Sequence, residues 1–246
     1  MTSPTGSGDR LRCRTRAVFF DVGNTLLYPY PSVSEVVREV LCEEGHIHDL
    51  SAIDSFMPLV DDYYEDRYRE DDTFWTDEDE TSAVWVGMYS LLCRKLGIDL
   101  DAERIARRVY DEFGDPGRWR AYSDVVPAFE RLRDRGVRIG LISNWDKRLT
   151  GIFTGLGIGD MLDTVVSSAE VGLHKPDPRI FELALSRVGV SAQESVHVGD
   201  HHYADILGAE AVGMLPVLID RHGGAPPEQG HFVRTLDDLD PLIEWG

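Results

Sequence analysis

Residues 137–219 read VRIGLISNWDKRLTGIFTGLGIGDMLDTVVSSAEVGLHKPDPRIFELALSRVGVSAQESVHVGDHHYADILGAEAVGMLPVLI, and this segment decides the fold. Short apolar runs alternate in it with stretches whose apolar residues recur at helical spacing. The pattern predicts strands at 137–142, 164–167, 195–198 and 215–219, and helices at about 149–156, 180–188 and 204–211. Such alternation implies right-handed crossovers. The predicted fold class is therefore α/β, a doubly wound parallel sheet with helices on both faces.

The first strand of this sheet lies far upstream, at residues 17–20, where a short apolar run is closed by Asp21 and Gly23. From Ser32 the apolar spacing becomes helical, Ser32 and Glu35 are placed as a capping box, and helices are expected to about residue 113. The helical block is therefore an insertion after the first strand. We predict a mobile tail at 1–16, a core domain at 17–29 and 123–246, and a mainly helical domain at 30–122.

The composition limits the partners that the chain can have. Its 25 basic and 44 acidic residues give a net charge of −19, which repels phosphate backbones and anionic membrane surfaces. Three cysteines are too few and too scattered for a disulfide framework. The sequence shows neither an apolar run of about 18 residues nor the apolar stretch of a signal peptide. We predict a cytoplasmic monomer or homodimer that binds a small molecule, with no nucleic-acid or membrane partner.

Residues 61–80 are both acidic and aromatic. Eleven acids stand against two arginines there, and five aromatic residues are interleaved with them. We interpret the segment as a solvated helical face whose aromatic side chains turn inward. An acidic, aromatic rim above a binding site is the alternative.

Polar residues follow four of the predicted strands. Asp21 follows the first strand, Ser143 and Asn144 follow the second, Lys175 comes after a loop behind the third, and Asp200 follows the fourth. Ligands bind outside the carboxyl ends of the strands in an open parallel sheet, so these side chains should converge. A single aspartate after a strand is usually a turn former, and a single lysine before proline is usually solvated. Their joint occurrence predicts a site.

Each of these residues has a task if the substrate is a phosphate ester. Asp21 can attack phosphorus and also bind Mg²⁺, and Asp200 would complete the metal site. Lys175 supplies a compact positive charge, while Ser143 and nearby backbone N–H groups can bind the phosphoryl group. Asp205 is either an acid in the first turn of a helix or an outer support of the metal site.

Four segments resemble the motifs of the haloacid dehalogenase superfamily: DVGNTL (21–26), LISNWD (141–146), KPDPRIF (175–181) and HVGDHHYAD (197–205). The chain looks most like the branch of haloacid dehalogenase-like hydrolase domain-containing proteins. The resemblance covers about residues 17–220 and implies a Rossmann-like core with a helical cap at 30–122. It also implies that Asp21 is the nucleophile and that Ser143 and Lys175 are the partners for phosphate and charge. It further implies that Asp200 is a Mg²⁺ ligand and that Asp205 supports it. The predicted phosphate-binding set is Thr25, Ser143, Asn144 and Lys175.

One position departs from the resemblance. Phosphatases of this superfamily carry a second aspartate two residues after the nucleophile, which acts as general acid and then as base, and here that residue is Gly23. The metal ligand from this position is the backbone carbonyl, which Gly23 retains. General acid–base help contributes about 10²–10⁴ in rate. We therefore predict a Mg²⁺-dependent hydrolase that acts slowly on a small phosphorylated metabolite through an aspartyl phosphate on Asp21.

Other functions stay open at this point. Gly23 also supports the alternative of a non-catalytic or regulatory protein that binds phosphate. A metal-independent dehalogenase would have tyrosine at this position, and a phosphonate hydrolase would use a lysine of the cap, where the sequence offers Lys95. His201 and His202 could replace the missing acid or could cap the next helix.

Overall fold

The computed structural model describes residues 14–224 and 226–243, and its centre is a six-stranded parallel sheet. The strand order is β5-β4-β1-β6-β7-β8. The strands are β1 (Ala17–Phe20), β4 (Arg138–Ser143), β5 (Thr164–Ser167), β6 (Ser195–Gly199), β7 (Leu215–Ile219) and β8 (His231–Val233). The five strands expected from the sequence are confirmed to within one residue, whereas β8 was not predicted. The predicted doubly wound α/β fold is also confirmed.

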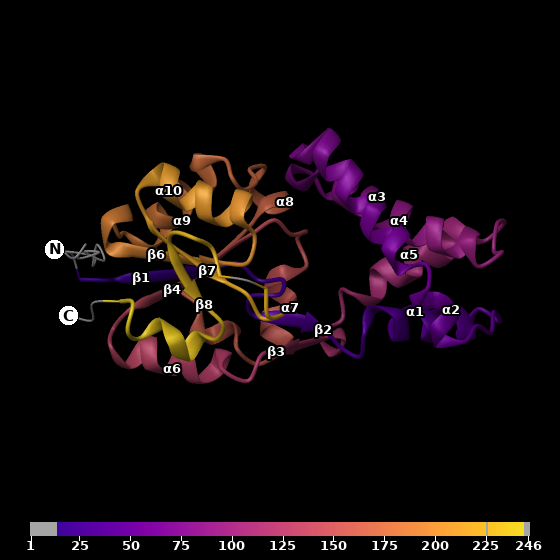
Figure 1. Cartoon of the computed structure of the whole chain (residues 1–246), viewed down its shortest axis with the longest axis horizontal. Helices are drawn as coiled ribbons and strands as arrows, with labels where there is room; N and C mark the ends of the chain where they lie inside the picture. Colours follow the sequence, from indigo (N-terminus) through magenta and orange to yellow (C-terminus); the bar gives the residue numbers. More distant parts are fainter. Residues whose placement is uncertain (1–13, 225, 244–246) are drawn as a thin grey trace, which may run out of the picture.

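Helices cover both faces of this sheet (Figure 1). Side chains alternate along β1, so Phe20 packs on one face against Phe129, at 5.4 Å between ring centroids. Phe19 points to the opposite face and packs with Phe181. The helices of the core are α6 (Val125–Asp134), α7 (Leu149–Gly155), α8 (Ser168–Val171), α9 (Pro178–Val188) and α10 (Gly208–Val212). Burying each of these phenylalanines contributes about 1.5–3 kcal/mol, so both layers are anchored through β1.

The strand order places a crevice at the carboxyl end of β1. In the sheet, β4 and β5 lie on one side of β1, and β6, β7 and β8, which follow them in the chain, lie on its other side. Ligands bind in open α/β sheets where the strand order reverses in this way. Asp21, Ser143 and Asp200 stand at or directly after the ends of the three strands that meet there.

In the sequence, a helical block lies between β1 and the other strands of the sheet. It comprises α1 (Val33–Glu43), α2 (Leu50–Asp54), α3 (Met57–Glu70), α4 (Glu78–Lys95) and α5 (Ala102–Glu112). The predicted capping box of Ser32 and Glu35 is present at the start of α1. The chain enters and leaves the block along an antiparallel ribbon of β2 (Leu27–Pro29) and β3 (Trp119–Ala121), which the sequence did not reveal. In Figure 1 the block stands beyond one end of the sheet.

Two local expectations need correction. The single helix expected at 204–211 is a π-helical turn, His202–Leu207, followed by α10. Widened turns of this kind often occur at functional sites. The tail expected at 1–16 lies mostly outside the described residues, but Thr15 is buried, and Arg16 bonds through its backbone to Glu194 and Arg138. The packed chain thus begins before Ala17.

No helix within the two described ranges is both long enough and apolar enough to cross a membrane.

Candidate active site

Three side chains from distant parts of the chain meet at the carboxyl end of β1. Ser143 Oγ donates a hydrogen bond of 3.0 Å to Asp21 Oδ1, and Lys175 Nζ donates one of 2.6 Å to the same oxygen. All three residues are buried. A carboxylate that receives an ammonium and a hydroxyl on one oxygen is held in a fixed orientation. The convergence expected from the strand ends is therefore present.

Lys175 is clamped between two carboxylates. Its Nζ also lies 2.6 Å from Asp205 Oδ1. Burial alone would lower the pKa of Lys175, but the negative charges of Asp205 and Asp21 outweigh it and raise the pKa above its usual value. The pKa of Asp205 is held well below its usual range, because the charge of Lys175 and a hydrogen bond from His197 overcome the effect of burial. The pair is thus ionised at neutral pH.

Asp205 is fixed on both of its oxygens. His197, on β6, lies with Nε2 at 2.9 Å from Oδ1, and the backbone N–H of His201 donates to Oδ2 at 3.0 Å. A Cβ at position 199 would lie 2.2 Å from Asp205 Cγ, so only glycine allows the carboxylate to approach β6 this closely. Burial lowers the pKa of His197, so this ring is neutral at neutral pH. Asp205 supports Lys175 from behind, and its expected part as an outer support of the metal site stays a prediction.

The site carries more negative than positive charge. Asp21, Asp200 and Asp205 each offer a carboxylate oxygen within 4.8 Å of the others, against the single cation of Lys175. Burial, and next the charges of Asp21 and Asp205, raise the pKa of Asp200 to about 7. Hard oxygen donors with surplus negative charge are the environment that Mg²⁺ prefers. The residues present therefore fit a divalent cation.

Two of the predicted phosphate ligands are engaged elsewhere. Thr25 Oγ1 donates to Asp200 Oδ1 at 3.2 Å. The amide of Asn144 makes a reciprocal pair with the backbone of Lys175, accepting at 2.7 Å and donating at 3.1 Å. These contacts fit roles in positioning Asp200 and Lys175, and the phosphate contacts predicted for Thr25 and Asn144 stay predictions.

Backbone donors remain available beside Asp21. The N–H groups of Gly23 and Asn144 donate no hydrogen bond to any described residue, and both residues line the cavity above Asp21. The carbonyl of Gly23 accepts a bond of 2.6 Å from the N–H of Thr25 and keeps a second lone pair. Free N–H groups close to a nucleophile are suited to binding an oxyanion.

The cavity above Asp21 has a volume of about 340 Å³ and lies between the helical block and the ends of β1 and β4. Its wall is largely aromatic and includes Tyr64, Trp75, Trp85, Tyr89, Tyr110, Phe113, Trp119 and Trp145. The acidic segment 61–80 contributes two of these rings, Tyr64 and Trp75, whereas its acids are exposed except for the half-buried Asp72 and Glu78. The aromatic side chains of the segment are buried or half-buried, as the favoured interpretation held, and two of them border the cavity, as the alternative of an aromatic rim held.

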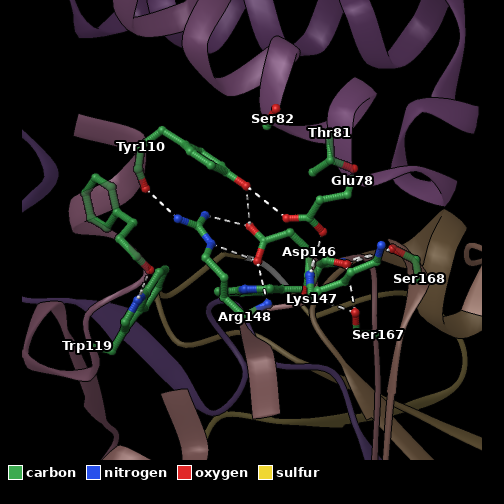
Figure 2. Close-up of polar contacts among 12 residues, drawn as sticks. Glu78, Thr81, Ser82, Tyr110, Trp119, Asp146, Lys147, Arg148, Ser167 and Ser168 are labelled. Atoms are coloured by element: carbon green, nitrogen blue, oxygen red, sulfur yellow. Dashed lines mark hydrogen bonds and ion pairs between the residues drawn. The ribbon is translucent and has the colours of Figure 1, made fainter. Parts of the chain in front are cut away.

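A polar contact that we did not predict joins the helical block to the core (Figure 2). Asp146 and Arg148 follow β4, and Arg148 binds both oxygens of Asp146, at 2.9 and 2.6 Å. Arg148 Nη1 also donates to the carbonyl of Tyr110 on α5, at 2.6 Å. Glu78, at the start of α4, accepts from the N–H of Lys147 at 2.9 Å. The Asp-x-Arg of SNWDKR (143–148) was visible in the sequence, but its partners on α4 and α5 were not.

Arg148→Met should lower the free energy of unfolding by about 3 kcal/mol. The substitution leaves the Asp146 carboxylate, whose side chain is 4% exposed, without its cation, and breaking a buried ion pair by removing one partner costs about 3–5 kcal/mol. Urea unfolding measures the loss. The matched control is Arg179→Met, because Arg179 pairs with Asp177 at the same spacing but is 69% exposed, so its loss should stay below about 1 kcal/mol. Equal losses in both variants would contradict this account of the contact.

The alternative proton donors and nucleophiles do not reach the cavity. His201 Nδ1 accepts a hydrogen bond of 3.1 Å from the N–H of Ala204 and so caps the following turn, as one of the two interpretations held. His202 and Lys95 are exposed, and Lys95 lies in the last turn of α4. Among the described residues that line the cavity, none of these three is found.

Comparison with known proteins agrees with this geometry. Residues 15–213 match the family described as haloacid dehalogenase-like hydrolase. The chain is 29% identical over 243 residues to haloacid dehalogenase-like hydrolase domain-containing protein 3 of Danio rerio, a match that covers 95% of this chain and 98% of that protein. It is 31% identical over 250 residues to ribulose-1,5-bisphosphate 5-phosphatase of Halopiger xanaduensis, with 92% and 98% covered. The crystal structure of a HAD phosphatase from Thermococcus onnurineus superposes with a TM-score of 0.64 at 26% identity, covering 93% of this chain and 97% of that one.

Proposed function

Because the chain belongs to the haloacid dehalogenase-like hydrolases, we propose that it hydrolyses a small phosphate monoester, with Asp21 as nucleophile and Mg²⁺ as cofactor. One observation carries the proposal: Lys175 and Ser143 both bind Oδ1 of Asp21, and the other carboxylate oxygen accepts no bond from a described residue. The nucleophile is thus oriented, and free on one oxygen, at the floor of the cavity. The relationship to two named phosphatases supports the class of substrate.

The reaction follows from these contacts. Asp21 attacks phosphorus, the bond between phosphorus and the ester oxygen breaks, and an aspartyl phosphate forms. The free N–H groups of Gly23 and Asn144 bind the phosphoryl oxygens, and Ser143 turns its one O–H from Asp21 to the phosphoryl group. Lys175 balances the charge of the nucleophile. Bound to Asp21, Asp200 and the carbonyl of Gly23, Mg²⁺ would supply positive charge to the phosphoryl group. Water then cleaves the aspartyl phosphate and releases inorganic phosphate.

The second half of this reaction should be the slow one. Gly23 cannot deprotonate the attacking water, and a positioned base contributes about 10²–10⁴ in rate. We further propose that residues 30–122 act as a cap that excludes water from the cavity, with the core at 17–29 and 123–246. Cytoplasmic location and a monomeric or homodimeric state stay predictions.

The proposal is tested by assaying p-nitrophenyl phosphate with Mg²⁺ and with excess chelator. Mg²⁺-dependent release of nitrophenol is expected, because the leaving group needs no proton and the charge of Asp21 and Asp200 needs a counterion. Turnover unaffected by chelator would instead favour a metal-independent, dehalogenase-like reaction. Binding of phosphate without any turnover would favour the non-catalytic alternative that Gly23 keeps open.

Asp200→Asn should distinguish the effect of Asp200 on Mg²⁺ binding from its effect on the stability of the metal-free protein. In the metal-free protein native Asp200 keeps its proton up to a pKa of about 7, whereas unfolded aspartate loses it near 3.9, so stability falls as pH rises between these values. At pH 8 metal-free Asp200→Asn should therefore melt at a higher temperature than metal-free wild type.

The response to Mg²⁺ should be reversed. At 100 times Kd a ligand stabilises by about 2.7 kcal/mol, which is a rise of several degrees for a chain of this size. Differential scanning fluorimetry should show this rise in wild type and in Asp66→Asn, whose side chain is exposed on α3, and not in Asp200→Asn. A Mg²⁺-induced rise that survives Asp200→Asn would exclude Asp200 as a ligand.

A further inference from the structure

The wall of the cavity above Asp21 offers flat apolar surfaces. Tyr64 and Trp85 stack with ring centroids 6.0 Å apart, and Trp75 meets Trp85 edge-on at 6.2 Å. Trp119 packs on Trp145 at 5.0 Å, and both rings line the same cavity. A planar group entering between these rings gains both buried apolar area and ring–ring contact, whereas a polyhydroxylated chain would lose hydrogen bonds to water without replacement.

The same cavity has no free positive charge on its described lining. Apart from Asp21, its charged residues are Asp146 and Arg148. The guanidinium of Arg148 is already bound to both oxygens of Asp146 and to the carbonyl of Tyr110, and it stacks on the Tyr110 ring at 3.8 Å. A second phosphate would therefore enter the cavity without a partner, which is costly. The lining fits a monophosphate and disfavours a bisphosphate.

The described lining of the cavity offers no strong acid to protonate the ester oxygen. Apart from Asp21 its one carboxyl is Asp146, which is bound by Arg148, and burial raises the pKa of the tyrosines that line it. A Cβ at position 23 would lie 3.7 Å from Trp145 Cζ3, so an indole ring borders the place where the family's second aspartate would stand. The leaving group must then depart without being protonated. A phenol has a pKa of about 10, whereas an aliphatic alcohol resembles water at about 16, so a phenolate leaves far more readily than an alkoxide.

We propose that the substrate is a small aryl phosphate, in which the phosphate is esterified to a phenolic oxygen and the ring lies among the aromatic side chains of the cavity. The proposal rests on the function proposed above. Asp21 forms the bond to phosphorus, the bond to the phenolic oxygen breaks, and that oxygen leaves with the electron pair and takes its proton from water. Water then cleaves the aspartyl phosphate to give inorganic phosphate.

Three monophosphates and one bisphosphate test the two parts of this proposal. Phenyl phosphate and benzyl phosphate both carry a ring, but benzyl phosphate must release an alkoxide, and ethyl phosphate has neither feature. With Mg²⁺ we expect kcat/KM, which does not include the shared hydrolysis of the aspartyl phosphate, to be at least tenfold higher for benzyl phosphate than for ethyl phosphate. We expect kcat/KM for phenyl phosphate to exceed that for benzyl phosphate by about 10² or more. Ribulose 1,5-bisphosphate should be turned over more slowly than any of the three.

Variants test which residues cause the preference for a ring and the preference for a phenolate leaving group. Trp85→Ala should raise KM for phenyl phosphate at least tenfold, whereas Trp85→Phe should keep KM within about threefold of wild type. Phe56→Ala should leave KM unchanged, because Phe56 is a half-buried ring of the helical block outside the cavity lining. Gly23→Asp should raise kcat/KM for benzyl phosphate more than for phenyl phosphate. Calorimetric titration of Mg²⁺-loaded Asp21→Asn measures binding without turnover, and phenyl phosphate should bind to this variant more tightly than ethyl phosphate.

Two outcomes separate this inference from the proposed function. If p-nitrophenyl phosphate is hydrolysed but ethyl phosphate or the bisphosphate matches phenyl phosphate in kcat/KM, the phosphatase assignment stands and the aryl substrate is wrong. If none of the phosphates is hydrolysed, both are wrong. Equal KM values in Trp85→Ala and Trp85→Phe, each folded by circular dichroism, would also overturn the placement of the ring.

Discussion

Asp21→Asn is expected to abolish turnover of p-nitrophenyl phosphate, with kcat at least about 10⁴-fold below wild type. An amide has no anionic oxygen to attack phosphorus, and removing the nucleophile of a covalent mechanism typically costs this much or more. The substitution is isosteric, so Ser143 can still donate to the oxygen at position 21. Steady-state kinetics with Mg²⁺ measure the effect.

Asp177→Asn is the matched control for this variant. Asp177 lies two residues after Lys175 in the loop that precedes α9 and caps that helix through the N–H of Arg179, a task that asparagine performs equally well. Its kcat should stay within about twofold of wild type. Activity that survives Asp21→Asn at more than a few per cent would show that another residue is the nucleophile.

Lys175→Met is expected to produce a loss of comparable size and to destabilise the protein as well. The methionine fills the same volume but leaves Asp21, Asp200 and Asp205 facing one another without a cation. We expect kcat to fall at least about 10³-fold, and the free energy of unfolding without Mg²⁺ to fall by about 3–5 kcal/mol at pH 8.

The loss of stability in Lys175→Met should depend on pH. Without Lys175 the native carboxyls bind protons more tightly than they do in the unfolded chain, so the stability of the variant should fall more steeply from pH 6 to pH 8 than that of wild type. Urea unfolding at both values measures the difference. Lys147→Met, which removes an exposed lysine four residues after Ser143, should change neither kcat nor stability appreciably. A stable, active Lys175→Met would refute the role given to the clamped ammonium.

The sheet and the cluster of candidate site residues were predictable because both follow from local signals. Each strand is a short apolar run, and each functional residue comes at or just after the end of one, so parallel packing alone brings Asp21, Ser143 and Asp200 to one edge. Lys175 does not stand at a strand end, but its place in the loop behind the third predicted strand already put it in the set, and the resemblance of the KPDPRIF segment supported this. The edge strand β8 escaped because three residues of mixed polarity, His231–Val233, carry no comparable pattern.

The contacts between the helical block and the core were not predictable in the same way. Arg148 meets Tyr110 across 38 positions of sequence, and nothing local indicates which face of α5 turns toward β4. The aromatic cavity could not be predicted for the same reason. The sequence indicated that Tyr64 and Trp75 turn inward, but not that they line one cavity with Trp145 and Trp119. The engagement of Asn144 with Lys175 likewise depends on two loops meeting.

The central claim is a covalent phosphate on Asp21 that forms faster than it breaks down. Rapid mixing with excess p-nitrophenyl phosphate and Mg²⁺, followed by acid quench and mass spectrometry of the peptide that contains Asp21, tests it most directly. The account predicts a burst of nitrophenol approaching one equivalent per site, slow turnover afterwards, and an acyl phosphate on Asp21, since Gly23 supplies no base for its hydrolysis. Steady turnover with neither a burst nor a phosphate on Asp21 would contradict it.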